Sequence, residues 1–554
     1  MVPTFRAPCP LTLLTRIARP GIATAAVILI AAAAPVPAAS QVVTDTLSIG
    51  GRSSWEEGFI SFLDLDRIVL GPRSTGMGGT GLAVVGGAEY FSLNPALILG
   101  DPDWVLTSEI AMRSGGGSVS RFPERLDVGP NVSFESSNYR VRPQLATSYR
   151  NLSLGMPLVF LGKRGGLALA YRRLSPNFQG TETRFEVVGP VTNNIPATLG
   201  VGTEPEGGYD AFTFGVARNM SSWLDLGANC NVHSGEFKNK VSIGASVFGQ
   251  PITTGGEVFS QEVGGFNIDL GAKARLGRLS LGGSLFLGYD LSFEGGRVDI
   301  RPLPDAQDPN SPVFLVHQTV LDHTISVPTT YGVGGAFQFT DRLLLAADYW
   351  ARPFSKAEIT RRSLTPQMGF ADPADSLSFG FALLAGEGNE TFSAGLNDVN
   401  SLRFGAEYTL IEREGLRVPF RAGFRTEDLA INNIVVEPPY DDYLGLIQSY
   451  YNVSVLGMDP PEGTTLEQIE AQLLQAIEFE QIPFQGDAVS ATTISAGLGF
   501  ELRRFRIDVA AEFTSFDIDR FFFRGFDPQF SPTADTTEES RNLRTLTFST
   551  TMNF

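Results

Sequence analysis

The chain has 554 residues and a formal net charge of −18 at neutral pH, with 60 glycines, 41 phenylalanines and only two cysteines. The negative charge argues against nucleic acid as a partner, and the cysteine count excludes a disulfide framework. The length suits one large domain or several ordinary ones.

Residues 1–40 have the pattern of a secretory signal peptide. Three arginines precede the apolar run GIATAAVILIAAAA at 21–34, and the small residues PVPAAS follow at 35–40. This order predicts cleavage near Ser40, and the apolar run is short for a membrane-spanning helix. Beyond residue 40 no stretch of the sequence is long and apolar enough for such a helix. An exported chain that is 43% hydrophobic is then either a secreted β-protein or an outer-membrane barrel.

Glycines crowd residues 71–100, where Gly76, Gly78 and Gly81 have the spacing of a dinucleotide-binding loop. That loop needs a strand before it and a helix after it. The helix would have to pass through a Gly-Gly pair, and glycine is a poor helix former. We therefore predict no nucleotide cofactor, and we attribute these glycines to close packing of the backbone.

Apolar and polar residues alternate along most of the remaining chain. Near the end, Leu546, Phe548 and Met552 share one face, while Thr545 and Thr547 lie on the other. A period of two indicates β-strands with one apolar and one polar face. The fourteen candidate strands are 103–114, 142–158, 164–174, 208–218, 223–235, 260–276, 278–292, 328–339, 342–352, 400–411, 416–426, 490–501, 504–516 and 543–554.

The links between these strands alternate in length. Short links, such as FLGKR at 160–164, follow the even-numbered strands, and mostly long ones, such as 517–542, follow the odd-numbered strands. A β-sandwich also alternates in its side chains, but its connections are of mixed length. Short turns at one end and long loops at the other are typical of an outer-membrane barrel. We therefore predict an all-β fold, a transmembrane antiparallel β-barrel of about 14 strands at 102–554.

Charged residues fall on the polar face of neighbouring strands. An arginine facing lipid near the membrane midplane costs roughly 2–4 kcal/mol, so these side chains are predicted to face the lumen. There they would form either a selective polar pore or a salt-bridge network that holds the barrel together. The predicted lumenal charges are Arg403, Glu407, Arg417, Arg421, Arg506, Asp508 and Glu512.

Residues 41–101 precede the first strand and are too few and too rich in glycine for an independent domain. A fourteen-stranded barrel has a wide lumen, so we predict that this segment fills it as a plug. Its pattern Arg-x-x-Gly-Met-Gly-Gly, followed by Asn-Pro-Ala, resembles the N-terminal segment of FadL/TodX-type outer-membrane proteins and their PorV-like relatives. The predicted plug motif is Arg73, Gly76, Gly78, Gly79, Asn94 and Pro95.

The same resemblance extends to TTYGVGGAFQFTDRLLLAADY at 329–349, NSLRFGAEYTL at 400–410, VPFRAGF at 418–424 and the terminal Phe554. It implies a fourteen-stranded outer-membrane barrel with an N-terminal hatch, assembled by the barrel-assembly machinery through Phe554. The FadL-like reading implies passive uptake of small hydrophobic molecules, fatty-acid-like or aromatic. The PorV-like reading implies a scaffold in protein secretion that transports no small molecule.

Two loops contain candidates for ligand capture. The loop at 427–489 contains a predicted helix at 464–480, with either Thr464 or Thr465 as the N-cap of a capping box. An apolar stripe on this helix and a phenylalanine run in the last loop would either pack on the barrel rim or capture an apolar ligand. These candidates are Leu466, Ile469, Leu473, Ile477, Phe521, Phe522 and Phe523.

The sequence contains no recognisable enzyme constellation. His233, His317 and His323 lack metal-ligand spacing, and the last two are expected in a solvated loop. Cys230 falls on an apolar face and is expected to pack there. We therefore predict no catalytic residue, metal or cofactor, and the predicted partners are outer-membrane lipid and a small hydrophobic ligand.

Overall fold

The computed structural model describes much of the chain after residue 70. The predicted signal peptide at 1–40 and the apolar stripe of the predicted helix at 464–480 lie outside the described residues. The described residues are 71–84, 90–100, 103–119, 125–129, 132–141, 146–160, 162–174, 181–188, 197–247, 250–294, 299–300, 322–370, 379–394, 396–432, 464, 465, 468, 488–526 and 532–554.

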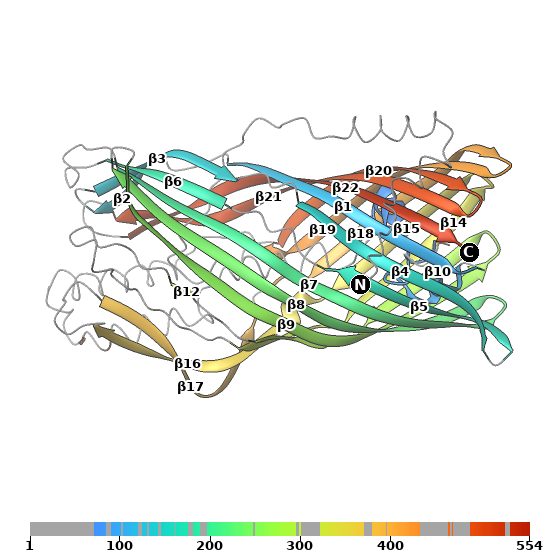
Figure 1. The fold of residues 1–554 in the computed structure, drawn as a ribbon, viewed down its shortest axis with the longest axis horizontal. Coiled ribbons are helices and arrows are strands. Elements are labelled where there is room, and N and C mark those ends of the chain that lie inside the picture. The colour runs from blue at the N-terminus through green and yellow to red at the C-terminus, as the bar shows by residue number, and fades with distance from the viewer. Residues whose placement is uncertain are drawn as a thin grey trace, which may run out of the picture. The chain divides into compact units, whose positions relative to one another are not determined.

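Fourteen strands of the described chain form a closed antiparallel ring (Figure 1). Each strand pairs with the next, and the last returns to the first with Val105 opposite Asn553. The predicted antiparallel barrel of about 14 strands is confirmed. In chain order the strands are β1 (Val105–Val119), β4 (Ala146–Phe160), β5 (Lys163–Arg173), β7 (Ala197–Ser221), β8 (Leu224–Val247), β9 (Gln250–Leu276), β10 (Leu279–Phe286), β14 (Thr330–Thr340), β15 (Leu343–Arg352), β18 (Val399–Arg413), β19 (Leu416–Asn432), β20 (Ala488–Leu502), β21 (Phe505–Phe526) and β22 (Pro532–Asn553).

Strand pairing continues into regions that the sequence analysis assigned to long loops. The predicted loop at 517–542 is a hairpin of β21 and β22, in which Phe522 lies opposite Asp535. Backbone groups in a long excursion need partners, and continued pairing supplies them. The additional strands are β2 (Arg125–Gly129), β3 (Val132–Val141), β6 (Thr181–Val188), β11 (Tyr289–Glu294), β12 (Asp299–Ile300), β13 (His323–Val327), β16 (Glu358–Phe370) and β17 (Phe379–Ser393).

The helices are short. Those whose full range lies in the described part of the chain are α4 (Pro72–Gly76) and the 3-10 turns η1 (Pro95–Gly100) and η3 (Phe354–Lys356). Among the residues that the structure describes, no helix is long and apolar enough to cross a membrane.

The two faces of the ring strands differ in polarity. In β18, the outward Leu402, Phe404 and Tyr408 are 46%, 50% and 45% exposed, whereas Arg403 and Glu407 between them are 3% and 2% exposed. An apolar exterior around a polar interior is the arrangement that lipid requires of a transmembrane barrel. Large exposed hydrophobic residues are found on the outward face of nearly every ring strand.

Candidate functional site

The described residues 71–84 and 90–100, here called the N-terminal segment, contact the inner face of the ring. Helix α4 begins at Pro72, whose missing N–H is not needed at a first helical position. The chain then turns at Gly78 and Gly79, which have φ of 69° and 84°, a conformation that glycine adopts without steric cost. These two glycines of the predicted motif are therefore required by the backbone of the turn.

Asn94 holds the second half of the segment in place. Its amide nitrogen donates to the carbonyl oxygens of Leu82 at 2.8 Å and Ala272 at 2.9 Å, and its side-chain oxygen accepts from the N–H of Ala96 at 3.0 Å. Pro95 then begins η1. Asn94 thus joins the two halves of the segment to each other and to wall strand β9.

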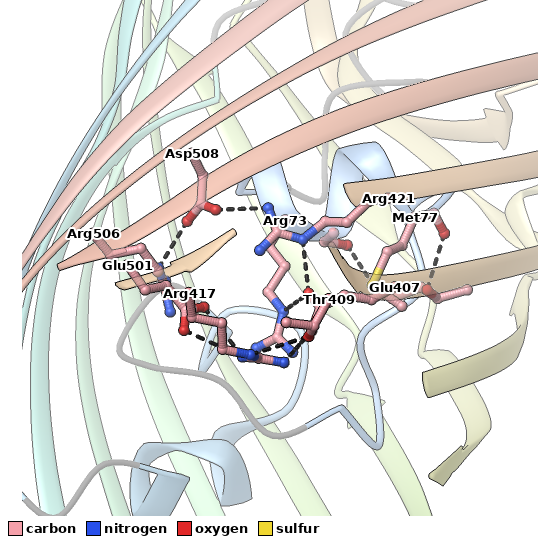
Figure 2. A network of polar contacts seen from close by, with 11 residues as sticks. Arg73, Met77, Glu407, Thr409, Arg417, Arg421, Glu501, Arg506 and Asp508 are labelled. Carbon is pink, nitrogen blue, oxygen red and sulfur yellow. Dashed lines mark hydrogen bonds and ion pairs between the residues drawn. The ribbon is translucent and has the colours of Figure 1, made fainter. Parts of the chain in front are cut away.

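A buried ion pair joins the segment to the barrel wall. Nε and Nη2 of Arg73 donate to the two carboxylate oxygens of Glu407 at 2.7 and 2.9 Å (Figure 2). Burial lowers the pKa of the Arg73 guanidinium, but the adjacent Glu407 charge outweighs it, and the pKa lies above its ordinary value. Arg73 therefore stays charged. Both residues were expected from the sequence to have a role, one in the plug motif and one as a lumenal charge, but their pairing was not predicted.

Several predicted lumenal charges belong to one network with Arg73 (Figure 2). Arg421, fully buried, donates to Glu407 at 2.7 Å and to Asp508 at 2.6 Å, and Arg506 lies 2.7 Å from Asp508. Arg417 reaches Glu407 at 3.4 Å. Paired charges of both signs offset the cost of burying each one alone.

The other two predicted charges meet in a second network. Arg425 contacts both Glu512 at 2.6 Å and Glu427 at 3.0 Å, and Arg403 lies 3.7 Å from Glu427. The sequence analysis placed Glu427 at the start of a loop, which was wrong, because β19 runs to Asn432. Its position on the polar face of that strand is the signal that identifies it.

Further polar contacts fix the backbone of the segment. Asp348, only 4% exposed, accepts from the N–H groups of Gly81 at 2.7 Å and Leu82 at 3.0 Å. Arg403 donates to the carbonyl oxygen of Gly79 at 3.2 Å. The sequence analysis missed Asp348, although it is the lone acid in the apolar strand β15.

The closest contacts between segment and wall occur at glycines of the wall. A Cβ added at Gly405 would lie 2.5 Å from the carbonyl oxygen of Met77, and one at Gly497 would lie 3.2 Å from Cα of Gly76. Glycine weakens a strand, so its use here indicates close backbone approach. Among the described residues, the wall glycines that meet the segment, here called the glycine belt, are Gly166, Gly215, Gly227, Gly271, Gly282, Gly334, Gly405, Gly423 and Gly497.

The belt follows the strand register. Gly227 lies opposite Gly271, Gly282 opposite Gly334, and Gly405 opposite Gly423. The nine glycines come from nine ring strands on opposite sides of the barrel. The N-terminal segment therefore lies within the ring.

Apolar side chains occupy the interior away from the short turns. Leu174, Val263, Leu291 and Phe354 belong to a buried cluster there, to which β7, β9, β11, β13, β16, β18, β19 and η3 contribute. Arg172, buried next to this cluster, donates to Thr213 and to Asn231. The interior thus changes from charged to mostly apolar along the barrel axis.

Two histidines contribute to this interior. His233 stacks on Tyr289, with ring centroids 5.2 Å apart, and His323 on Phe293 at 4.6 Å. The expectation that His323 is solvated was wrong, because it is 6% exposed in β13 and its ring is covered by the aromatic partner. His317 lies outside the described residues. Cys230 is exposed on the outward face of β8.

The predicted ligand-capture residues are not brought together by the described part of the structure. Leu466, Ile469, Leu473 and Ile477 lie outside it, and Phe521, Phe522 and Phe523 are in β21 rather than in a loop. Thr465 and Gln468 exchange backbone-to-side-chain hydrogen bonds of 3.0 and 3.2 Å, which is the capping-box arrangement. In the described regions, no group of three or more His, Cys, Asp or Glu residues is arranged to hold a metal ion.

No family model matches the sequence, and no curated protein does. Solved structures similar to this chain include a Pseudomonas aeruginosa FadL homologue, with a TM-score of 0.49 and 10% identity over 88% of this chain and 98% of that one. The Ralstonia pickettii toluene transporter TbuX has a TM-score of 0.46 and 12% identity over 88% and 100%. The Pseudomonas putida toluene transporter TodX has 0.43 and 13% over 88% and 99%.

Proposed function

We propose that this protein is an outer-membrane channel for passive uptake of small hydrophobic molecules, fatty-acid-like or aromatic, and that the N-terminal segment is its plug. The proposal rests on one observation: the N-terminal segment packs closely against the glycine belt on the inner face of the ring. Contact with nine ring strands leaves little room for a continuous aqueous pore at that level. The FadL-like sequence motifs support the class of cargo.

The apolar interior fits this cargo. Val263, Leu291 and Phe293 are packed against apolar neighbours there, so a hydrophobic molecule, which leaves water favourably, would pass by displacing those neighbours. A pore for polar solutes would instead need a continuous polar lining. The buried charge networks near the short turns then serve to anchor the plug and brace the wall.

Outer-membrane location and assembly belong to the same proposal. Phe554, 58% exposed, follows β22, and its N–H donates to the carbonyl oxygen of Trp104 at 2.9 Å. An exposed terminal aromatic next to the closing strand pair is available to the barrel-assembly machinery. The signal peptide predicted at 1–40 would direct export and be cleaved in the process.

One observation favours the alternative, a scaffold in protein secretion without small-molecule transport. The segment is held by the Arg73–Glu407 pair, by Asp348 and by the belt together. Moving it would break all of these contacts. A segment that never leaves the lumen would keep the barrel closed, which is compatible with a scaffold that only binds other proteins at its surface.

Uptake in intact cells separates the two functions. The full-length protein would be produced in Gram-negative cells that lack their own hydrophobic-compound channels, and initial uptake of radiolabelled oleate and toluene would be measured. Transport predicts faster uptake of one of them than in cells carrying empty vector. Unchanged uptake, with the folded barrel present in the outer membrane, overturns the transport proposal. Co-purification of secreted proteins from the same cells would then support the scaffold.

A further inference from the structure

The short-turn edge of the barrel is rich in exposed basic residues. The outward apolar face ends there at Leu276, Phe339 and Ile411, which are 52%, 56% and 42% exposed. Charged residues follow in the turns that join β4–β5, β9–β10, β14–β15, β18–β19 and β20–β21 and in the strand ends beside them. The exposed basic residues, here called the basic rim, are Lys163, Arg164, Arg275, Arg278, Arg342, Arg413, Arg503 and Arg504.

Acidic residues do not balance this edge. In the described chain, eight exposed basic residues stand there against four exposed acidic ones, a surplus of four. Arg278 lies in the β9–β10 turn, with Arg275 at the end of β9 before it, and Arg503 and Arg504 lie in the β20–β21 turn. Neither turn has an exposed acidic residue. The exposed acidic residues of this edge are Asp103, Asp341, Glu412 and Glu414.

The opposite edge of the apolar band has the opposite sign. Among the described residues there, Lys356 and Arg544 are the exposed basic residues, against eight exposed acidic ones. The two edges of one barrel therefore present different charges to the two leaflets of a membrane. The acidic residues are Glu236, Glu262, Asp290, Glu294, Asp322, Glu358, Asp398 and Asp517.

The basic rim lies where lipid headgroups begin. Trp104 and Trp223, 50% and 51% exposed, lie at the same edge, and such aromatic residues favour the headgroup level. A basic residue immediately beyond the apolar band is then within reach of lipid phosphates. The acidic edge repels the same phosphates.

Internal contacts leave the rim able to bind phosphate. Arg278 uses one nitrogen to donate to the carbonyl oxygen of Phe339 at 3.3 Å, and Arg275 pairs with Asp225. Lys163 donates to the carbonyl oxygen of Met220, and Arg342 lies 4.0 Å from Glu412. An arginine has five N–H donors, so donors remain on Arg278, Arg275 and Arg342. The guanidinium fork matches the geometry of a phosphate group.

We propose that the basic rim binds the headgroup phosphates of anionic glycerophospholipids, and so fixes the turn edge of the barrel in the phospholipid leaflet. This interaction is independent of the cargo and holds for a channel or a scaffold alike. Because exposed charges are screened by salt, the preference for anionic lipid weakens as ionic strength rises.

Lipid retention by the full-length protein tests the proposal. The protein would be placed in nanodiscs containing a minority of phosphatidylglycerol in phosphatidylcholine, and the lipids that remain bound would be counted by native mass spectrometry. We expect phosphatidylglycerol to be enriched over its share of the bilayer, by about fivefold for each engaged basic residue at low salt. Bound lipids in the proportions of the bilayer overturn the proposal without any variant.

Matched variants locate the interaction. Combining Arg278→Gln, Arg503→Gln and Arg504→Gln should abolish most of the enrichment, whereas Lys356→Gln with Arg544→Gln at the acidic edge should leave it intact. Heat-modifiability gels establish that both variants are folded. Unchanged enrichment in the rim variant, or equal loss in both variants, contradicts the assignment. Displacement of the bound lipid by inorganic phosphate would show a free-anion site instead.

Discussion

Replacing Gly78 by alanine should loosen the N-terminal segment, whereas replacing Gly277 by alanine should not. Both glycines have positive φ, 69° and 67°, so the backbone strain of adding a Cβ is similar, about 1–2 kcal/mol. A Cβ at Gly78 would lie 2.7 Å from backbone atoms of Phe404 and Phe424, but nothing lies within 4 Å at Gly277. Gly277 stays in the wall when the segment leaves it, so Gly277→Ala controls for adding a Cβ at positive φ without disturbing the segment.

The contact of the added Cβ with the wall determines how much more often the segment leaves the wall in Gly78→Ala than in Gly277→Ala. The obstructing atoms belong to the backbone of the paired strands β18 and β19 and cannot rotate away, and overpacking of this kind costs about 1–3 kcal/mol. Unseating also releases the strain at Gly78, about 1–2 kcal/mol, which is at least as large as the roughly 0.4–1 kcal/mol by which alanine stiffens the released segment, so overpacking alone gives a conservative figure. Gly78→Ala should therefore raise the unseated population roughly 5- to 140-fold relative to Gly277→Ala.

Trypsin measures this population directly. Arg73 is 8% exposed and paired with Glu407, so cleavage after it requires the segment to leave its seat. The rate at which the fragment beginning at Ser74 appears, followed by mass spectrometry in detergent, tracks the open population when reseating is fast. Equal cleavage rates in the two variants would refute the packing argument.

Two further predictions concern the wall. Glu407→Gln should destabilise the folded protein by about 3–5 kcal/mol, because it leaves Arg73 and Arg421 buried without their shared carboxylate. Glu412→Gln, whose partner Arg342 is 4.0 Å away and exposed, should cost at most about 1 kcal/mol; equal midpoints in heat-modifiability gels would contradict this. On the outward face of β9, Leu270→Arg should impair barrel assembly by about 2–4 kcal/mol, whereas Glu262→Arg beyond the apolar band should cost about 0–1 kcal/mol. Equal yields of folded barrel from Leu270→Arg and Glu262→Arg would mean that the outward apolar band does not include Leu270 while excluding Glu262.

The transmembrane strands were predictable because lipid imposes a strict alternation. Leu402, Phe404 and Tyr408 must face outward once Arg403 and Glu407 face inward, and the register of the neighbouring strands repeats the pattern. Beyond the apolar band the alternation is inverted, with apolar side chains facing inward and polar ones facing outward. In β13 the buried residues are apolar or aromatic, such as Ile325 and Val327, and the outward Ser326 is polar. Sequence reasoning that sought an apolar exterior therefore assigned such segments to loops.

The site was predictable only in part. Charges on the polar face of β18 and β19 indicated a lumenal set, but the Arg73–Glu407 pair spans 334 positions, and no local pattern specifies such a partner. The role of the glycine belt could not be predicted from single positions either. Gly405 and Gly423 each look like a weak strand position, and their shared role becomes visible only when the register places them opposite each other and against Gly78.

Single-channel conductance in planar bilayers tests the central claim, that the seated segment closes the barrel. The full-length protein should show no steady ion conductance, because the segment contacts the wall at the glycine belt. Deletion of residues 41–95 should produce a large, stable conductance, since the ring strands pair among themselves and remain folded. A full-length protein that already conducts as well as the deletion variant would contradict the account.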